Sequence, residues 1–446
     1  MNCSDTIFAV SSGSGMAGIA VIRLSGQKAA TLLKLTAGVL PSPRFAAVRQ
    51  LRDPLTKEII DQALVLWMPG PNTVTGEDIA EFHVHGSLAV VEALFSLFLK
   101  QDGVRLAEAG EFTRRAFIND RMDLVEVEGL GDLLHARTEA QRRMALHHML
   151  GDASSIYESW RGELIGILAR LEAAIDFIDE AGVAEAALVD VKSRTVDLVA
   201  RLNKAAAESD RAGTLRSGVK VVFAGAPNVG KSSLLNLVAA REAAIVSSRP
   251  GTTRDVIEVS IVLGGVPVIL TDTAGLRDDS EDEIEAIGMA RAKSEMAGAD
   301  ILVWLDSADR EATDLPVALP ALRVLNKMDL ATPNSIHVRN NLADDDVLPI
   351  SVKTGEGIAA FLSVLEKCVS ARFGGLEHAI VIRTRQKSAV EESIRHLNDS
   401  LTFKADQIEF ATECVRKASH ALARVTGRVD VEDLLGKIFS DFCIGK

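Results

Sequence analysis

The chain of 446 residues has few cysteines and no long apolar run. Its four cysteines, Cys3, Cys368, Cys414 and Cys443, show no CxxC spacing. This argues against a disulfide framework or a zinc site and favours a reducing compartment, the cytoplasm. No apolar run approaches the ~18 residues that a membrane span needs. The first residues also lack a basic stretch before an apolar one, so we predict no signal peptide.

Aromatic side chains and positive charge are also scarce. Phe, Trp and Tyr make up only 4% of the chain, which argues against a surface that stacks RNA bases. The formal net charge of −13 argues against non-specific binding to nucleic acid or to an anionic membrane. Any contact with RNA must therefore be local or shared with a partner protein.

What is present suggests about three domains. Residues 1–119 mix short apolar runs with glycine turns and predict strands at 19–24, 63–68 and 79–85 and a helix at 88–99, an α+β pattern. Residues 120–215 are predicted to be helical, and 211–218 have the composition of a linker. The apolar stripe of the helical part steps by three and four through Trp160, Leu164, Leu168, Leu171, Ile175 and Ile178.

Residues 216–375 form a predicted α/β domain, because β-branched runs alternate there with helical stretches. Helical periodicity returns in residues 376–446. An α/β domain between two helical stretches indicates an insertion, with the two helical parts packed as one discontinuous domain.

A phosphate-binding loop is predicted at residues 225–232, whose sequence GAPNVGKS fits GxxxxGK[ST]. The alternative for this pattern alone is a glycine turn before an ordinary helix. A strand at 219–224 and a helix at 233–238 supply the required context. Lys231 should reach the β- and γ-phosphates and Ser232 should bind Mg²⁺. The expected phosphate contacts are Asn228, Val229, Gly230, Lys231, Ser232 and Ser233.

Two further segments complete the phosphate side. The buried strand at 268–272 ends in Asp272, which is expected in the outer shell of Mg²⁺. Thr273, Ala274 and Gly275 follow it, and the Gly275 amide can contact the γ-phosphate. Upstream, Gly251, Thr252 and Thr253 offer a hydroxyl for Mg²⁺ and a switch backbone.

The residues Asn326-Lys327-Met328-Asp329 follow a predicted strand and select the base. The Asp329 carboxylate can accept hydrogen bonds from guanine N1–H and N2–H₂, a pair that adenine does not offer. Ser351, Val352 and Lys353 have the spacing of the loop that closes over guanine. These motifs, in this order, predict a GTPase of the translation-factor kind.

Hydrolysis must depend on residues other than those of Ras-type sites. The residue after Gly275 is Leu276, which cannot orient water. A monovalent cation held by Asn228 and by residues 247–252 would place positive charge beside the phosphates. Glu285 follows an acidic stretch and opens the next helical run, from which it could orient water through a bridging water.

With these residues in hand, the chain resembles the MnmE (TrmE) family of tRNA-modification GTPases over essentially its whole length. Besides the GTPase motifs, the resemblance is carried by residues 18–26 (GIAVIRLSG), 75–78 (TGED) with 81–86, 110–120 (GEFTRRAFIND) and 442–446 (FCIGK). It implies an N-terminal tetrahydrofolate-binding and dimerisation domain at 1–119. It also implies a helical domain at 120–215 and 376–446, with a Ras-like P-loop G domain inserted at 216–375.

The resemblance also implies roles for individual residues. K⁺-stimulated GTP hydrolysis would use Asn228, Ser247, Arg249 and Thr252 around K⁺, Ser232 and Thr253 on Mg²⁺, and Glu285 as the catalytic glutamate. Folate would contact Arg23, Glu81, Arg121 and Lys446. Arg121 stands where lysine is common in the family, and Val74 where an aromatic is common.

The family works with an FAD-containing partner, MnmG (GidA). Together they place an aminomethyl-type group at C5 of the wobble uridine of certain tRNAs. The rival function is an RNA-binding or ribosome-assembly switch that modifies nothing.

Three further readings stay open. Glu81, His83 and His85 share a strand face, which fits either a metal site or a structural or folate-facing histidine pair. Cys443 is either a buried cysteine or a catalytic thiol near the one-carbon site. The pair Arg114 and Arg115 is either solvated or in contact with tRNA or a partner.

Overall fold

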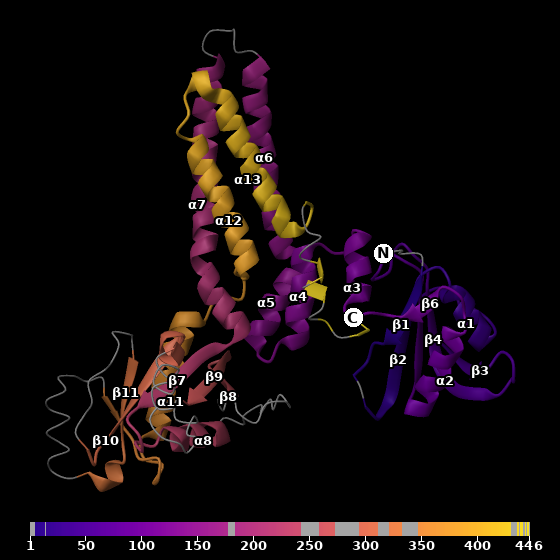
Figure 1. Cartoon of the computed structure of the whole chain (residues 1–446), viewed down its shortest axis with the longest axis horizontal. Helices are drawn as coiled ribbons and strands as arrows, with labels where there is room; N and C mark the ends of the chain where they lie inside the picture. The colour runs from indigo at the N-terminus through magenta and orange to yellow at the C-terminus, as the bar shows by residue number, and fades with distance from the viewer. Residues whose placement is uncertain are drawn as a thin grey trace, which may run out of the picture. The chain divides into compact units, whose positions relative to one another are not determined.

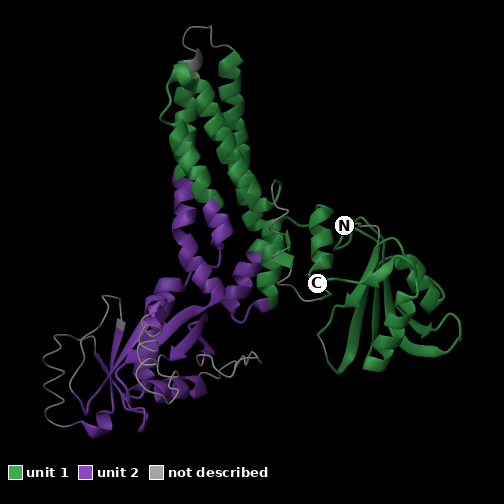
Figure 2. Cartoon of the chain, viewed as in Figure 1, with its two compact units in different colours: residues 1–134, 148–199, 389–446 green, residues 135–147, 200–388 purple. Residues whose placement is uncertain are grey.

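The computed structural model (Figure 1) describes residues 5–13, 15–176, 183–241, 258–272, 294–310, 321–331 and 347–429, and, beyond these, 435–436, 438–439, 442 and 444–445. The chain divides into two compact units (Figure 2). Unit 1 comprises residues 1–134, 148–199 and 389–446, and unit 2 comprises residues 135–147 and 200–388. The division falls before the last residue of α4 (Leu124–His135) and within α5 (Glu139–Met149), α7 (Val183–Ser217) and α12 (Thr384–Ser400).

Unit 1 begins with a six-stranded sheet in the order β3-β4-β5-β2-β1-β6. The neighbouring strands are antiparallel except β1 and β6, which are parallel. The helices α1 (Ala29–Ala37), α2 (Leu88–Leu99) and α3 (Glu111–Ile118) complete this part. The strands are β1 (Thr6–Val10), β2 (Ala17–Ser25), β3 (Ala47–Arg52), β4 (Ile59–Met68), β5 (Ile79–Gly86) and β6 (Val104–Leu106).

The predicted strands and the helix of the N-terminal part are all found, and the α+β class is confirmed. Apolar residues at alternate positions of β2 and β5 are buried, whereas Arg23 and Glu81, on the other face, are half-buried. The buried face packs an aromatic group in which the Phe98 ring contacts those of Phe8 and Phe82, with centroids 5.3 and 5.5 Å away.

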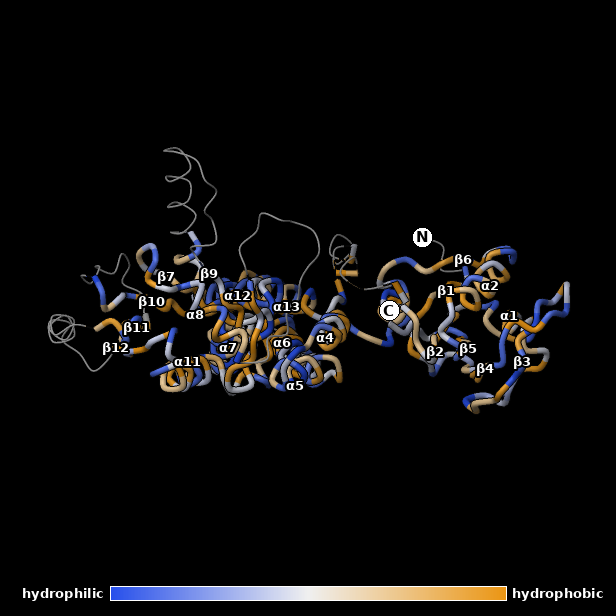
Figure 3. Tube along the Cα trace, turned by 90° about the horizontal axis from the view of Figure 1, so that it is seen from below, coloured by the Kyte–Doolittle hydropathy of each residue, from blue (hydrophilic) through white to orange (hydrophobic). Residues whose placement is uncertain are grey.

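Besides α1, α2 and α3, the helices that the structure describes in unit 1 are α4 (Leu124–His135), α6 (Asp152–Asp176), α13 (Ile408–Thr426) and the portions of α5, α7 and α12 that lie in it. Hydrophobic and hydrophilic residues alternate within the turns of these helices (Figure 3). Among the described residues, none of the helices has the length and apolar character needed to cross a bilayer.

The apolar stripe of α6 differs from the predicted one. Ile167 and Ala174 are buried, whereas the predicted Leu168 and Ile175 are only half-buried. All four residues lie on one broad apolar face of the helix, and the residues at the centre of that face change along its length because the helix has 3.6 residues per turn. Ile178 lies outside the described residues. The buried residues of α6 that step by three and four along the helix are Tyr157, Trp160, Leu164, Ile167, Leu171 and Ala174.

The linker predicted at 211–218 is wrong. Helix α7 continues through it and ends at Ser217, and Gly218, with φ +103°, follows. Ala212 and Leu215 lie three residues apart, both are fully buried, and both belong to the core that covers the second sheet. Burial of this face outweighs the roughly 1 kcal/mol cost of Gly213 within a helix.

Unit 2 contains a second six-stranded sheet in the order β12-β11-β10-β7-β9-β8. All neighbours are parallel except β8 and β9. The strands are β7 (Val219–Gly225), β8 (Glu258–Leu263), β9 (Val266–Asp272), β10 (Ile301–Ser307), β11 (Ala321–Asn326) and β12 (Val347–Pro349), with helices α8 (Lys231–Arg241) and α11 (Ile358–Phe373). This is the predicted Ras-like α/β fold.

Candidate functional site

The nucleotide motifs converge because of the strand order. The parallel strands β7, β9, β10, β11 and β12 end at one edge of the sheet, where ligands of open α/β sheets bind. This edge brings together the phosphate-binding loop after β7, Asp272 at the end of β9 and Asn326 at the end of β11.

The phosphate-binding loop requires glycine at two positions. Gly225 has φ +145°, and a Cβ there would lie 2.2 Å from the Leu305 carbonyl oxygen. Gly230 has φ +101°, and a Cβ there would lie 2.3 Å from Asn326 Nδ2. Asn228 is exposed and left-handed, with φ +64°. The loop is thus closely packed against the strand ends, and backbone amides can approach a ligand without side chains in the way.

Lys231 starts α8 and is buried, with 6% of its surface exposed. Its Nζ donates to the carbonyl oxygens of Gly225 and Ala226, both at 3.0 Å. The ammonium group therefore lies within the curve of the loop, where phosphate oxygens would be bound.

Ser232 and Asp272 provide the oxygen ligands suited to Mg²⁺. The Ser232 hydroxyl donates to the Asp272 carboxylate, which is buried. Mg²⁺ is usually held by one or two protein oxygens together with waters and nucleotide phosphates. The residues present fit that ion, and it would neutralise phosphate charge when bound.

Asn326 joins the phosphate side to the base side. Only 2% of its surface is exposed. Its Nδ2 donates to the Val229 carbonyl oxygen at 2.8 Å, and its Oδ1 accepts from the Val352 amide at 3.1 Å. The buried hydroxyl of Ser351 donates to Asp329 Oδ1 at 2.7 Å, so the exposed carboxylate predicted to read guanine is oriented by the adjacent loop.

Several predicted site residues lie outside the described residues. On the nucleotide side these are Ser247, Arg249, Gly251, Thr252, Thr253, Thr273, Ala274, Gly275 and Glu285. In the predicted folate site, Cys443 and Lys446 also lie outside the described residues. Their predicted roles remain predictions.

In the N-terminal sheet, Arg23 and Glu81 face each other across β2 and β5, with Nε donating to Oε1 at 2.8 Å. His83 Nε2 lies 3.3 Å from the same carboxylate, whereas His85 bonds to Asp61 at 2.7 Å. The described residues contain no group of three or more His, Cys, Asp or Glu side chains placed to hold a metal ion. The metal reading of this strand face therefore gains no support.

Arg121 lies against the loop at residues 75–78. A Cβ on Gly76, which has φ +77°, would come within 3.3 Å of Arg121 Cγ. The side-chain amide of Asn119 donates to the Thr75 carbonyl oxygen at 2.7 Å. The backbone amide of Arg121 donates to the Ala116 carbonyl oxygen at 2.8 Å. The C-terminal end of α3 thus places Arg121 beside this loop.

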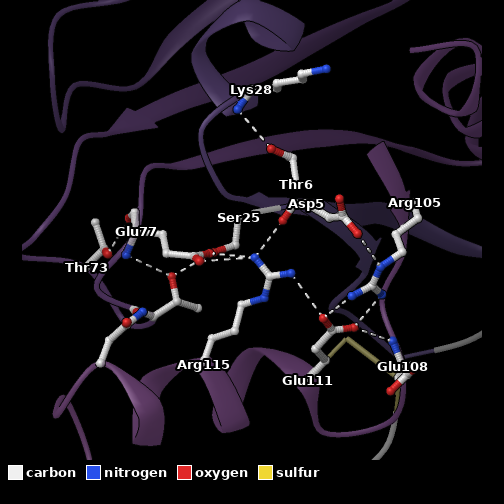
Figure 4. Close-up of polar contacts among 12 residues, drawn as sticks. Asp5, Thr6, Ser25, Lys28, Thr73, Glu77, Arg105, Glu108, Glu111 and Arg115 are labelled. Atoms are coloured by element: carbon white, nitrogen blue, oxygen red, sulfur yellow. Dashed lines mark hydrogen bonds and ion pairs between the residues drawn. The ribbon is translucent and has the colours of Figure 1, made fainter. Parts of the chain in front are cut away.

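A buried ionic network fixes α3 to the loop (Figure 4). Arg115 donates to Glu77 Oε2 at 2.9 Å and to Glu111 Oε1 at 3.1 Å, and Arg105 donates to Glu111 at 2.6 Å. Glu77 also accepts from the Ser25 hydroxyl at 2.6 Å. Only 2% of Arg115 is exposed, so both readings of this residue, as a solvated arginine and as a contact for tRNA or a partner, are wrong.

The network holds Glu111 in its charged form. Burial on its own raises the pKa of Glu111, but hydrogen bonds from Arg105, the Glu108 amide and Arg115 lower it to about 2. The ordinary value is 4.5, so the carboxylate stays ionised well into the acid range.

The C-terminal residues return to the N-terminal sheet within unit 1. Ile444 forms an antiparallel bridge with Ala109, and the Gly445 carbonyl oxygen accepts from the Ser11 hydroxyl at 3.0 Å. Gly445 has φ +96°, and a Cβ there would lie 2.1 Å from the Val10 carbonyl oxygen. Close packing at the end of β1 therefore requires glycine at this position.

Sequence reasoning missed Asp309 and Arg310, which contact the nucleotide loops. Lys327 Nζ lies 3.0 Å from Asp309 Oδ2, and Arg310 Nη1 donates to the Pro227 carbonyl oxygen at 3.1 Å. Their position directly after β10 could have indicated this contact, because β10 ends at the same edge of the sheet as the strands that carry the motifs.

The strand order, the glycine-lined phosphate loop, the Ser232–Asp272 pair and the Asn326–Asp329 segment together define a P-loop GTPase. Two family models match the chain: the GTP-binding protein TrmE N-terminus over residues 6–121 and the MnmE helical domain over residues 124–443. The chain belongs to the MnmE family, as its sequence predicted.

Similar curated proteins support this assignment over the full length. The tRNA modification GTPase MnmE of Methylobacterium sp. (strain 4-46) is 48% identical, with 99% of this chain and 100% of that protein covered. The protein of the same name from Rhodopseudomonas palustris is 44% identical, with 100% of each covered.

Among solved structures, the G domain of the T. maritima FeoB iron transporter is 23% identical and aligns over 33% of this chain and 98% of that chain. The TM-score of this match is 0.24.

Proposed function

We propose that the chain is a K⁺-stimulated GTPase that acts with an FAD-dependent partner of the MnmG (GidA) kind. Together they modify C5 of the wobble uridine, position 34, of certain tRNAs to aminomethyl or carboxymethylaminomethyl derivatives with a folate-derived carbon. The observation that carries GTP binding is the buried Asn326, bonded to both Val229 and Val352. The names of the full-length relatives support the tRNA modification.

The nucleotide residues divide the work. Lys231 and the loop amides would bind the phosphates, and Ser232 and Thr253 would hold Mg²⁺, with Asp272 in its outer shell. Asn228, Ser247, Arg249 and Thr252 would surround K⁺, whose charge stabilises the charge that develops on the phosphates. Glu285 orients the attacking water, since Leu276 cannot do so.

The N-terminal residues would hold the one-carbon donor. Arg23, Arg121 and Lys446 offer positive charge to the carboxylates of a tetrahydrofolate derivative, and Glu81 offers an acceptor. The half-buried Arg23–Glu81 pair supports this proposal, because α1 and α2 pack against the opposite face of the sheet and leave the face that carries this pair uncovered by them. Cys443 would supply a thiol close to this site.

The proposed domains are 1–119 for folate binding and dimerisation, 120–215 with 376–446 for the helical domain, and 216–375 for the GTPase. A homodimer formed through the N-terminal domain would join the partner in a cytoplasmic heterotetramer. Hydrolysis would gate a conformational cycle and supply no atoms to uridine.

The test measures GTP hydrolysis by the intact protein in K⁺ and in Na⁺ at equal ionic strength, with Glu285→Ala alongside. We expect a lower rate in Na⁺ and a loss of about 10²-fold or more in the variant. Equal rates in both salts would refute the cation site, and a wild-type rate for Glu285→Ala would refute the glutamate assignment. Uridine modification by the protein with and without its partner separates a modifying enzyme from an RNA-binding switch.

A further inference from the structure

The turn that begins at the last residue of β10, residues 307–310, contacts both the phosphate-binding loop and the base-reading segment. The Arg310 amide donates to the Ser307 carbonyl oxygen at 3.1 Å, which closes the turn. The Ala308 amide donates to the Asn326 carbonyl oxygen at 2.9 Å, which fixes the turn to the end of β11. We call these four residues the β10 turn.

One contact of the β10 turn reaches the base-reading segment. One oxygen of Asp309 accepts from the Ser307 hydroxyl, and the other lies 3.0 Å from Lys327 Nζ. The hydrogen bonds from Ser307 and Lys327 lower the pKa of Asp309, so the carboxylate is charged. Lys327 stands between Asn326 and Asp329 in a left-handed conformation, with φ +63°, so the ion pair restrains the side chain of a strained residue.

The other contact reaches the phosphate-binding loop. Arg310 Nη1 donates to the carbonyl oxygen of Pro227, the residue before the left-handed Asn228. A single turn thus connects the loop that holds the phosphates to the segment that holds the base. The buried Asn326 also connects the phosphate-binding loop to the base side of the site, through its hydrogen bonds with Val229 and Val352.

We propose that the β10 turn is a clamp that slows nucleotide release, with Asp309 and Arg310 as positioning residues that act through Lys327 and Pro227. Nucleotide release requires the phosphate and base segments to separate or loosen, and each clamp contact opposes that movement. The inference rests on the GTP binding of the proposed function. It adds residues that the GTPase motifs do not contain.

The expected effect is modest because the contacts are partly exposed. The side chains of Lys327 and Asp309 are 26% and 33% exposed. Ion pairs of this exposure change an equilibrium or a rate by about two- to fivefold. Salt screens such pairs, so the effect of removing Asp309 should shrink as ionic strength rises.

The experiment follows release of fluorescent N-methylanthraniloyl-GDP from the intact protein into excess GDP by stopped flow. The variants are Asp309→Ala, Asp309→Asn and Arg310→Ala. The matched control is Asp210→Ala, which removes another exposed acceptor of a lysine in unit 2, the 2.7 Å partner of Lys387, away from the nucleotide loops.

We expect release to be about two- to fivefold faster in Asp309→Ala and Arg310→Ala, smaller acceleration in Asp309→Asn, and the wild-type rate in Asp210→Ala. The Asp309→Ala difference should fall when ionic strength is raised at constant K⁺. The unfolding temperature without nucleotide should match that of the wild type, which a merely structural role would change. Should Asp309→Ala unfold, Asp309→Asn carries the same comparison.

Wild-type release rates in the Asp309 and Arg310 variants, or an equal acceleration in Asp210→Ala, would overturn the clamp. Failure of the wild-type protein to retain fluorescent GDP would instead overturn the GTP-binding assignment. The two failures are therefore distinguishable.

Discussion

At the scale of single residues, Asn326 uses both ends of a fully buried amide to connect two loops that are far apart in sequence. Replacement with alanine leaves the Val229 carbonyl and the Val352 amide without this partner, a cost of about 1–3 kcal/mol. We expect Asn326→Ala to weaken GDP affinity by about tenfold or more, measured by titration with fluorescent GDP. Asn326→Asp keeps the acceptor but turns a buried carboxylate oxygen toward the Val229 carbonyl oxygen, so it should weaken affinity at least as much as alanine does; unchanged affinity in both variants would contradict this role.

Glu111 carries a prediction about acid. Its pKa of about 2 in the folded protein lies below its ordinary 4.5, so the unfolded chain binds more protons between these values. Its contribution to stability is therefore complete above pH ~4.5 and is lost as pH falls toward ~2, on the order of 3 kcal/mol in all.

The test compares Glu111→Gln with the wild type by denaturation at a series of pH values from 7 to 2.5. The variant should be less stable at neutral pH, and its stability should fall less between pH 4.5 and 2.5. The control is Glu92→Gln, which removes an exposed glutamate of α2 in the same unit. Parallel pH profiles for Glu111→Gln and wild type would count against the network.

At this scale the sequence placed residues at the nucleotide edge of the sheet where a motif fixes both identity and spacing, as at Lys231, Ser232 and Asn326, whose roles toward GTP stay predictions. It failed for Arg115, whose partner Glu77 is 38 residues away, and for Asp309, whose partner Lys327 is 18 residues away. Single-sequence patterns describe neighbours along the chain, whereas these partners are chosen by the strand order and by the docking of α3.

At the scale of elements, the C-terminal part of α7 shows how burial overrides local composition. The sequence at 211–218 contains two glycines, two arginines and polar residues, which predicted a linker. The pair Ala212 and Leu215 is nevertheless spaced for a helix and fully buried in the core of unit 2. Strands of the nucleotide domain were easier to predict, because buried parallel strands are nearly continuous apolar runs.

This reading of α7 predicts the effect of Leu215→Ala. Truncation of a fully buried leucine should lower the free energy of unfolding of unit 2 by about 2–5 kcal/mol, while the exposed Lys204→Ala on the same helix should change it by less than about 0.5 kcal/mol. Of the three tryptophans, Trp304 alone lies in unit 2. Its fluorescence in a Trp67→Phe, Trp160→Phe background reports this transition in urea; equal effects of the two substitutions would restore the linker interpretation.

At the scale of the whole molecule, the order of elements along the chain differs from their grouping in space. Unit 1 combines residues 1–134 and 148–199 with residues 389–446, and its C-terminal residues bond to Ser11 and Ala109. The texture of the sequence predicted that a domain is interrupted by an insertion. It could not predict that residues 444–445 lie against β1, because no periodic pattern records a bridge of this length.

The position of these C-terminal residues separates the two proposed activities. Lys446 and Cys443 are assigned to folate, and the adjacent Gly445 and Ile444 pack on the N-terminal sheet, whereas the GTP residues all belong to unit 2. Deletion of residues 443–446 should therefore abolish binding of 5-formyltetrahydrofolate, measured by calorimetry on the intact protein, and leave the rate of GTP hydrolysis within about twofold of wild type. Lys446→Ala alone should lose the charge-assisted part of the affinity, about tenfold. Wild-type folate affinity after the deletion would remove Lys446 and Cys443 from the site, and a parallel loss of GTP hydrolysis would show that the deletion acts on the whole fold.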